Sequence, residues 1–153
     1  MPNNSFDDLF DAWGAALNVN PQLAKTVFHL ESNGNPNSPD GPQSPYAPPG
    51  ERAQGGMQLL PSTAAGLAQR LGFDPKAVNL HDMRWAVPLA TAYLAEGLNA
   101  TQSAPGALAY YFAGPDQSKW GSKTQDYVKR GLAMYPQMAL TPQQPDNTQT
   151  ASR

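Results

Sequence analysis

Apolar residues recur at the spacing of an α-helix along most of this chain, and that periodicity constrains the fold more than any other feature of the sequence. The first such stretch covers residues 5–17, with Ser5 as its expected N-cap and Asp7 and Asp8 in its first turn. The second covers residues 21–32, where Asn20 and Pro21 are typical of an N-cap and a first helical residue. These patterns predict a mainly α-helical fold.

Four further helices are expected, over residues 62–71, 82–98, 104–112 and 122–135. Gly72 is expected to end the first of them. Pro88 falls inside the second, so we expect either a kink or a true helix start near Ala86. Ser122 and Gln125 stand in the relation of a capping box at the start of the last helix.

A long segment rich in Pro, Gly, Asn and Ser separates the second and third helices, over residues 33–55. It predicts a long irregular loop or a small hairpin, and loops of this length in compact domains are usually functional or mobile. The chain length suits one domain, which we expect over residues 1–140. The Gln- and Pro-containing segment 141–153 is expected to be a disordered tail or linker.

The composition excludes several classes of function. The 10 basic and 12 acidic residues are spread along the chain without a basic block, so nucleic acid is not expected as a partner. There are no cysteines and only two histidines, so neither thiolate chemistry nor a metal site is expected. No apolar run approaches the roughly 20 residues of a membrane span, and no cofactor is implied.

Glu31 is the main candidate for a catalytic group. It lies at the end of the second predicted helix, four residues after Val27 and next to Leu30, so it borders the buried face. Burial against apolar groups raises the pKa of a Glu and keeps it protonated near neutral pH, as a general acid requires. Taken alone, a Glu at a helix end is more often a solvated surface residue.

Most glycosidases use a second carboxylate as nucleophile or base. Asp40, Glu51 and Asp116 are available, but none has a spacing that requires this role. One alternative is a substrate that supplies its own nucleophile, so that a single carboxyl group acts first as acid and then as base. The remaining groups would orient an acetamido sugar and stack on sugar rings, and the candidates are Met57, Gln58, Tyr110, Tyr111 and Tyr127. These aromatic residues could equally belong to the core.

Five short motifs follow one another along residues 20–132: Glu31-Ser32; Gly55-Gly56-Met57-Gln58 with Pro61-Ser62-Thr63-Ala64; Tyr93-Leu94; Tyr111-Phe112-Ala113-Gly114-Pro115; and Thr124-Gln125-Asp126-Tyr127-Val128. Each is weak alone. In this order they resemble the soluble lytic transglycosylase family, whose catalytic domain is related to goose-type lysozyme. The resemblance implies a lysozyme-like helical domain and an enzyme that degrades peptidoglycan.

By this resemblance, Glu31 would cleave the β-1,4 bond between N-acetylmuramic acid and N-acetylglucosamine, acting as acid and then as base. The product would carry 1,6-anhydro-N-acetylmuramic acid, so the enzyme would be a carbon–oxygen lyase. Ser32 would position Glu31 or the muramoyl side. The resemblance assigns substrate-binding roles to Met57 and Gln58 in the sugar sites, Tyr111 near Glu31, and Tyr127 in the cleft. No metal or other cofactor is implied.

Four departures from the family pattern leave other readings open. Gly56 replaces a Leu, Phe112 replaces an Asn, Ala86 stands where an Asn is common, and the loop before the glycine turn is longer than usual. The loop places Asp40 and Glu51 as possible auxiliary carboxylates. One alternative is therefore a lysozyme-like muramidase that hydrolyses the bond with a loop carboxylate. Another is a non-catalytic peptidoglycan-binding module of the same fold.

The expected partner is the glycan strand of peptidoglycan, and the expected place of action is the bacterial periplasm or cell wall. The N-terminus lacks the basic start and apolar core of a secretory signal. One hypothesis is therefore delivery by a phage virion, with the chain as a domain within a larger virion protein. The alternatives are a component of a secretion apparatus and a secreted enzyme whose signal has been removed.

Overall fold

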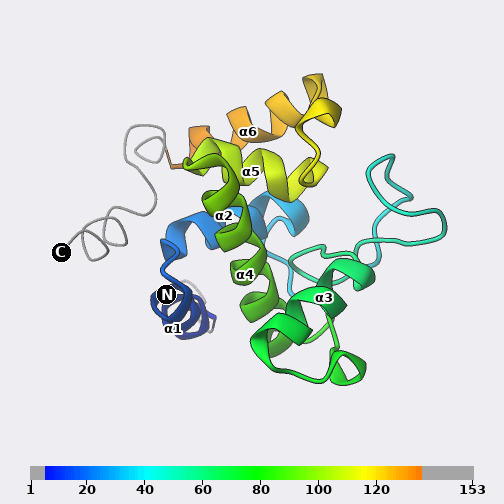
Figure 1. Cartoon of the computed structure of the whole chain (residues 1–153). Coiled ribbons are helices and arrows are strands. Elements are labelled where there is room, and N and C mark those ends of the chain that lie inside the picture. Colours follow the sequence, from blue (N-terminus) through cyan, green and yellow to red (C-terminus); the bar gives the residue numbers. More distant parts are fainter. Residues whose placement is uncertain (1–5, 136–153) are drawn as a thin grey trace.

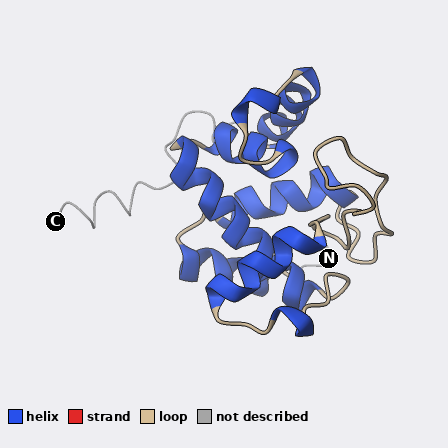
Figure 2. Ribbon diagram, turned by 45° about the vertical axis from the view of Figure 1, so that its right-hand side comes forward, coloured by secondary structure: helices blue, strands red, loops and turns tan. Residues whose placement is uncertain are grey.

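The structure, a computed structural model, describes residues 6–135, which contain six α-helices. They are α1 (Asp7–Leu17), α2 (Pro21–Ser32), α3 (Pro61–Leu71), α4 (Met83–Thr101), α5 (Ala104–Ala113) and α6 (Ser122–Met134), with short 3-10 helices at Pro75–Ala77 and Gln117–Lys119. Within this range the backbone forms no strand (Figure 2). It forms one isolated antiparallel bridge, between Gln54 and Leu59. The prediction of a mainly α-helical fold is confirmed.

Helix α4 is the centre of the fold. It runs through the middle of the molecule, with α1 and α5 packed against it (Figure 1). Apolar side chains cover most of its circumference, which is typical of a buried helix. Its fully buried residues include Val87, Leu89, Leu94 and Leu98. Of the helices described, none is long and apolar enough to span a bilayer.

Several predicted helix ends are confirmed by their caps. Helix α2 has the predicted bounds, and the Asn20 side chain caps it by accepting a hydrogen bond of 2.9 Å from the Gln22 N–H. Gly72 ends α3 in the left-handed conformation, with φ at 85°. Helix α5 extends one residue beyond the prediction, to Ala113.

The starts of α4 and α6 lie within one residue of the predicted bounds, but the alternative start of α4 near Ala86 and the predicted cap of α6 were wrong. Helix α4 begins at Met83, not near Ala86, because the Asp82 side chain caps it through the Arg84 N–H at 2.9 Å. Pro88 lies inside the helix and removes only one backbone donor. The predicted box between Ser122 and Gln125 is absent, since Ser122 is already helical.

At the start of α6, the Gly121 N–H instead donates to Thr124 Oγ1 at 3.1 Å.

Near the N-terminus, Phe6 occupies the N-cap position of α1 without a side-chain cap, and the predicted cap, Ser5, lies outside the described residues. The predicted tail, residues 141–153, and the expected domain boundary at residue 140 also lie outside them. That boundary therefore stays a prediction.

The loop between α2 and α3 stands out from the helices in both ribbon views (Figures 1 and 2). Its base is closed by a hydrogen bond of 2.8 Å from the Gly41 N–H to the Ala53 carbonyl. A glycine turn at residues 55–58 joins it to α3, with φ at 77° for Gly55 and at 51° for Gln58. An irregular loop was one of the two predicted forms, and the isolated bridge beside the glycine turn is the only trace of a hairpin in the described residues.

Candidate active site

Glu31 lies in the last turn of α2 and lines a cavity of about 540 Å³. The lining includes residues of the loop 41–48, of the end of α5 and of the first turn of α6. Helix α2 buries Leu23, Val27 and the residues beside them, which places Glu31 at the edge of that face. Among the residues that line the cavity, only Glu31 and Lys123 carry charge.

Tyr127 holds the Glu31 carboxyl group in place. The Tyr127 hydroxyl donates to Glu31 Oε2 at 2.7 Å, and the Tyr127 side chain is buried in the core. Burial raises the pKa of Glu31 from 4.5 to about 7, while the Tyr127 hydrogen bond and the charge of Arg130 act in the opposite direction. Near neutral pH the carboxyl can therefore either give or take a proton, which suits acid–base catalysis.

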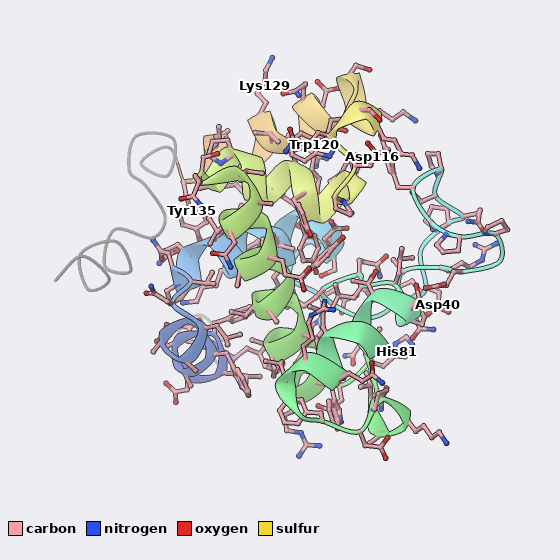
Figure 3. All side chains as sticks on the ribbon, viewed as in Figure 1. Asp40, His81, Asp116, Trp120, Lys129 and Tyr135 are labelled. Carbon is pink, nitrogen blue, oxygen red and sulfur yellow. The ribbon has the colours of Figure 1, made fainter. Side chains whose placement is uncertain are left out.

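The other carboxylates considered from the sequence are engaged elsewhere. Glu51 Oε1 accepts a 2.7 Å hydrogen bond from the Ser62 N–H at the start of α3. Asp40 Oδ1 lies 3.4 Å from His81 Nε2, at the base of the loop (Figure 3). Asp116 accepts from the backbone and hydroxyl of Ser118. None of the three lines the cavity, so Glu31 is the only carboxylate among the described residues that line it.

Tyr111 anchors the glycine turn to α5. Its hydroxyl donates to the Met57 carbonyl at 2.6 Å, while its ring lines the cavity. Met57 is 0% exposed, so its side chain belongs to the core. Gln58 also lines the cavity, and its amide Nε2 donates to the carbonyls of Pro39 at 3.1 Å and Gly55 at 2.8 Å. The turn is therefore fastened both to α5 and to the base of the loop.

Ser32 lies outside the cavity lining. Its hydroxyl donates to the Phe28 carbonyl at 3.1 Å and accepts from the Asn35 N–H at 3.1 Å. Both bonds shape the end of α2 directly after Glu31. The serine is thus placed to hold the helix end that carries the carboxyl group.

Two residues that line the cavity, Tyr46 and Lys123, were given no role by sequence reasoning. Tyr46 lies in a proline-rich loop without hydrophobic periodicity. The only sequence signal for a role in the site was an isolated aromatic residue in such a loop. Lys123 lies in the first turn of α6, where no motif marks it. Their approach to the cavity depends on tertiary packing.

Replacing Tyr127 with Phe should raise the pKa of Glu31 above 7, by roughly one pH unit. The hydrogen bond from Tyr127 stabilises the carboxylate, so its loss favours the protonated form. A carboxyl-detected NMR titration of Glu31 in wild type and variant would measure the change. Lys129→Ala, on the exposed face of the same helix, is the control and should leave the titration unchanged. An unchanged or lowered Glu31 pKa in the Tyr127 variant would contradict the prediction.

Comparison with known proteins assigns the chain to a family. The family model described as "Transglycosylase SLT domain" matches residues 8–132. A protein of Enterobacteria phage PRD1, named "Transglycosylase", is 33% identical over 116 residues, which are 76% of this chain and 37% of that protein. The chain thus spans little more than a third of the length of this relative. Because the family model covers most of the chain, including Glu31, the glycine turn and Tyr127, the protein belongs to the transglycosylase SLT domain family.

Proposed function

We propose that this protein is a peptidoglycan lytic transglycosylase. It cleaves the β-1,4 bond between N-acetylmuramic acid and N-acetylglucosamine and leaves a 1,6-anhydro-N-acetylmuramic acid end. The observation that carries the proposal is a single carboxyl group with a pKa of about 7 in a cavity that no other described carboxylate lines. Membership of the family and the name of the phage relative support the same reaction class.

In the first step, protonated Glu31 donates its proton to the glycosidic oxygen, and the bond between that oxygen and C1 of the muramoyl residue breaks. The resulting carboxylate then accepts the proton of the C6 hydroxyl, whose oxygen forms the new bond to C1. Protons and electron pairs balance without water. A carboxyl group with a pKa near the working pH can perform both transfers. The Tyr127 hydroxyl, 2.7 Å from Glu31 Oε2, stabilises the carboxylate between the two steps.

The residues around Glu31 have supporting roles in this proposal. Gln58 lines the cavity and presents its amide oxygen to the sugar, because the amide nitrogen is already bonded to the loop base. Tyr111 and the Met57 carbonyl keep the glycine turn in register with Glu31. Ser32 holds the end of α2. The substrate is the glycan strand of peptidoglycan.

We also propose that the protein acts at the bacterial cell wall and is delivered there by a phage virion. The PRD1 relative is a phage protein, which supports a phage origin. We further propose that the chain is one domain of a larger virion or secretion-apparatus protein. Delivery by a virion is tested by asking whether the protein is present in purified virions.

Analysis of the reaction products tests the proposed chemistry. Purified sacculi are digested with the enzyme, and the released muropeptides are measured by mass spectrometry. We expect anhydro ends, lighter by one water than reducing ends. Reducing ends would instead indicate a muramidase, and Glu51→Gln would then test whether a loop carboxylate activates the water. Binding to sacculi without released muropeptides would indicate a non-catalytic binding module.

A further inference from the structure

Two aromatic residues that line the cavity contact each other. Tyr46, on the loop between α2 and α3, meets Phe112, in the last turn of α5, with ring centroids 5.4 Å apart and ring planes at 63°. Both residues line the cavity that contains Glu31. Both residues are partly exposed, so the protein does not cover either of them completely.

The loop that carries Tyr46 is internally braced. Gln43 spans it, accepting from the Gly50 N–H at 2.9 Å and donating to the Pro48 carbonyl at 3.2 Å. Because proline fixes φ, the four prolines of residues 41–50 limit the conformations of the loop further. These prolines are Pro42, Pro45, Pro48 and Pro49. The backbone around Tyr46 is therefore restrained before any ligand binds, and the Tyr46 ring packs against Phe112.

The aromatic pair is connected to the reacting carboxyl group. Phe112 packs on Tyr127 with ring centroids 4.7 Å apart and planes at 30°, and the Tyr127 hydroxyl donates to Glu31 at 2.7 Å. A ring-shaped ligand resting on Phe112 would thus have a defined position relative to Glu31. The hydroxyl of Tyr46 has no hydrogen-bond partner among residues 6–135, so it is available to a ligand.

We propose that Tyr46 and Phe112 form a sugar-binding subsite in which one pyranose ring of the glycan strand stacks beside the bond to be cleaved. This proposal rests on the proposed function and adds a specificity-determining residue, Tyr46, to it. The C–H face of a sugar ring is apolar and fits the face of an aromatic ring, while the tyrosine hydroxyl bonds a sugar hydroxyl. The loop contributes no charged group to the cavity, which suits a neutral sugar.

Binding to an inactive background tests the subsite. In Glu31→Gln protein, the additional change Tyr46→Ala should weaken binding of peptide-free glycan strands about tenfold, equivalent to ~1.4 kcal/mol, by isothermal titration calorimetry. Tyr46→Phe should retain most of the affinity, because the ring is kept. Tyr46→Leu should bind weakly, because it is apolar but lacks a flat face. In otherwise wild-type enzyme, Tyr46→Ala should raise KM more than it lowers kcat.

Tyr135→Ala is the matched control, since Tyr135 lies at the end of α6 and does not line the cavity (Figure 3). It should leave glycan affinity unchanged. Tyr46→Ala protein that is folded by circular dichroism and binds glycan as tightly as its parent would overturn the subsite and leave the proposed function standing. If Tyr46→Leu protein binds glycan as tightly as its parent, Tyr46 provides only an apolar contact, and the proposal that a sugar ring stacks on it is overturned. Wild-type enzyme that neither binds glycan nor releases muropeptides would overturn both proposals.

Discussion

Replacing Glu31 with Gln is expected to abolish release of muropeptides from sacculi while the fold persists. The amide cannot donate the proton that the leaving oxygen needs, and no other described carboxylate lines the cavity. General acid–base catalysis contributes about 10²–10⁴-fold at each proton transfer, so a loss of at least ~10³-fold is expected. Turbidity loss of sacculi and mass spectrometry of the supernatant would measure it.

The same substitution should stabilise the protein above neutral pH. The pKa of Glu31 is about 7 in the folded protein, against an ordinary value of 4.5, so the folded protein binds this proton more tightly than the unfolded chain does. The stability associated with that proton is complete below pH 4.5 and is lost as pH rises through about 7. At pH 8, Gln removes the cost of the buried charge, and we expect a gain of ~1–3 kcal/mol in the free energy of unfolding.

Urea unfolding at about pH 4.5 and about pH 8 would measure this gain in the free energy of unfolding of Glu31→Gln. The gain should be small at the lower pH, where the Glu31 carboxyl group is already protonated. Asp126→Asn, an exposed carboxyl-to-amide change on α6, is the control and should alter neither lysis nor the pH dependence of stability. Retained lysis by Glu31→Gln would overturn the role of Glu31. A variant less stable than wild type at the higher pH would overturn the electrostatic argument.

Helices were predictable from the sequence because their signals are local. Asn20 and Pro21 mark the start of α2, and the bounds of that helix match the prediction. At α4 two local signals compete: Pro88 left a start near Ala86 open as an alternative, but the Asp82 cap places the start at Met83, next to the predicted bound. The position of Glu31 at the edge of the buried face followed from helical spacing alone.

Contacts within the candidate site were less predictable, because they join residues far apart in the chain. Tyr111 was expected near Glu31, and both line the cavity, but the hydroxyl that bonds Glu31 is that of Tyr127, while the Tyr111 hydroxyl bonds the Met57 carbonyl. The motif order indicates that both tyrosines approach the site, but only helix packing decides which hydroxyl reaches the carboxyl group. Tyr46 was missed for the same reason, since its contact with Phe112 depends on the shape of an irregular loop.

Replacing Gly55 with Ala is expected to cost more than ~3 kcal/mol of unfolding free energy, a large share of the roughly 5–15 kcal/mol typical of a domain. The φ of Gly55 is +77°, which disfavours any side chain, and an added Cβ would overlap the Leu80 carbonyl oxygen. Backbone cannot yield as a flexible side chain does, so the glycine turn must shift. That shift would move the Met57 carbonyl away from the Tyr111 hydroxyl and lower activity as well.

Gly72→Ala separates the cost of the positive φ from the cost of the overlap between the added Cβ and Leu80. Gly72 has a similar φ of +85°, but an added Cβ there would meet nothing within 4 Å. It should therefore lose only ~1 kcal/mol, the cost of the left-handed backbone alone, and keep full activity. Urea unfolding of both variants at one pH gives the difference directly. Equal losses at the two glycines would mean that the loop after α3 yields to the new methyl group, and that the glycine turn does not depend on close contact with Leu80.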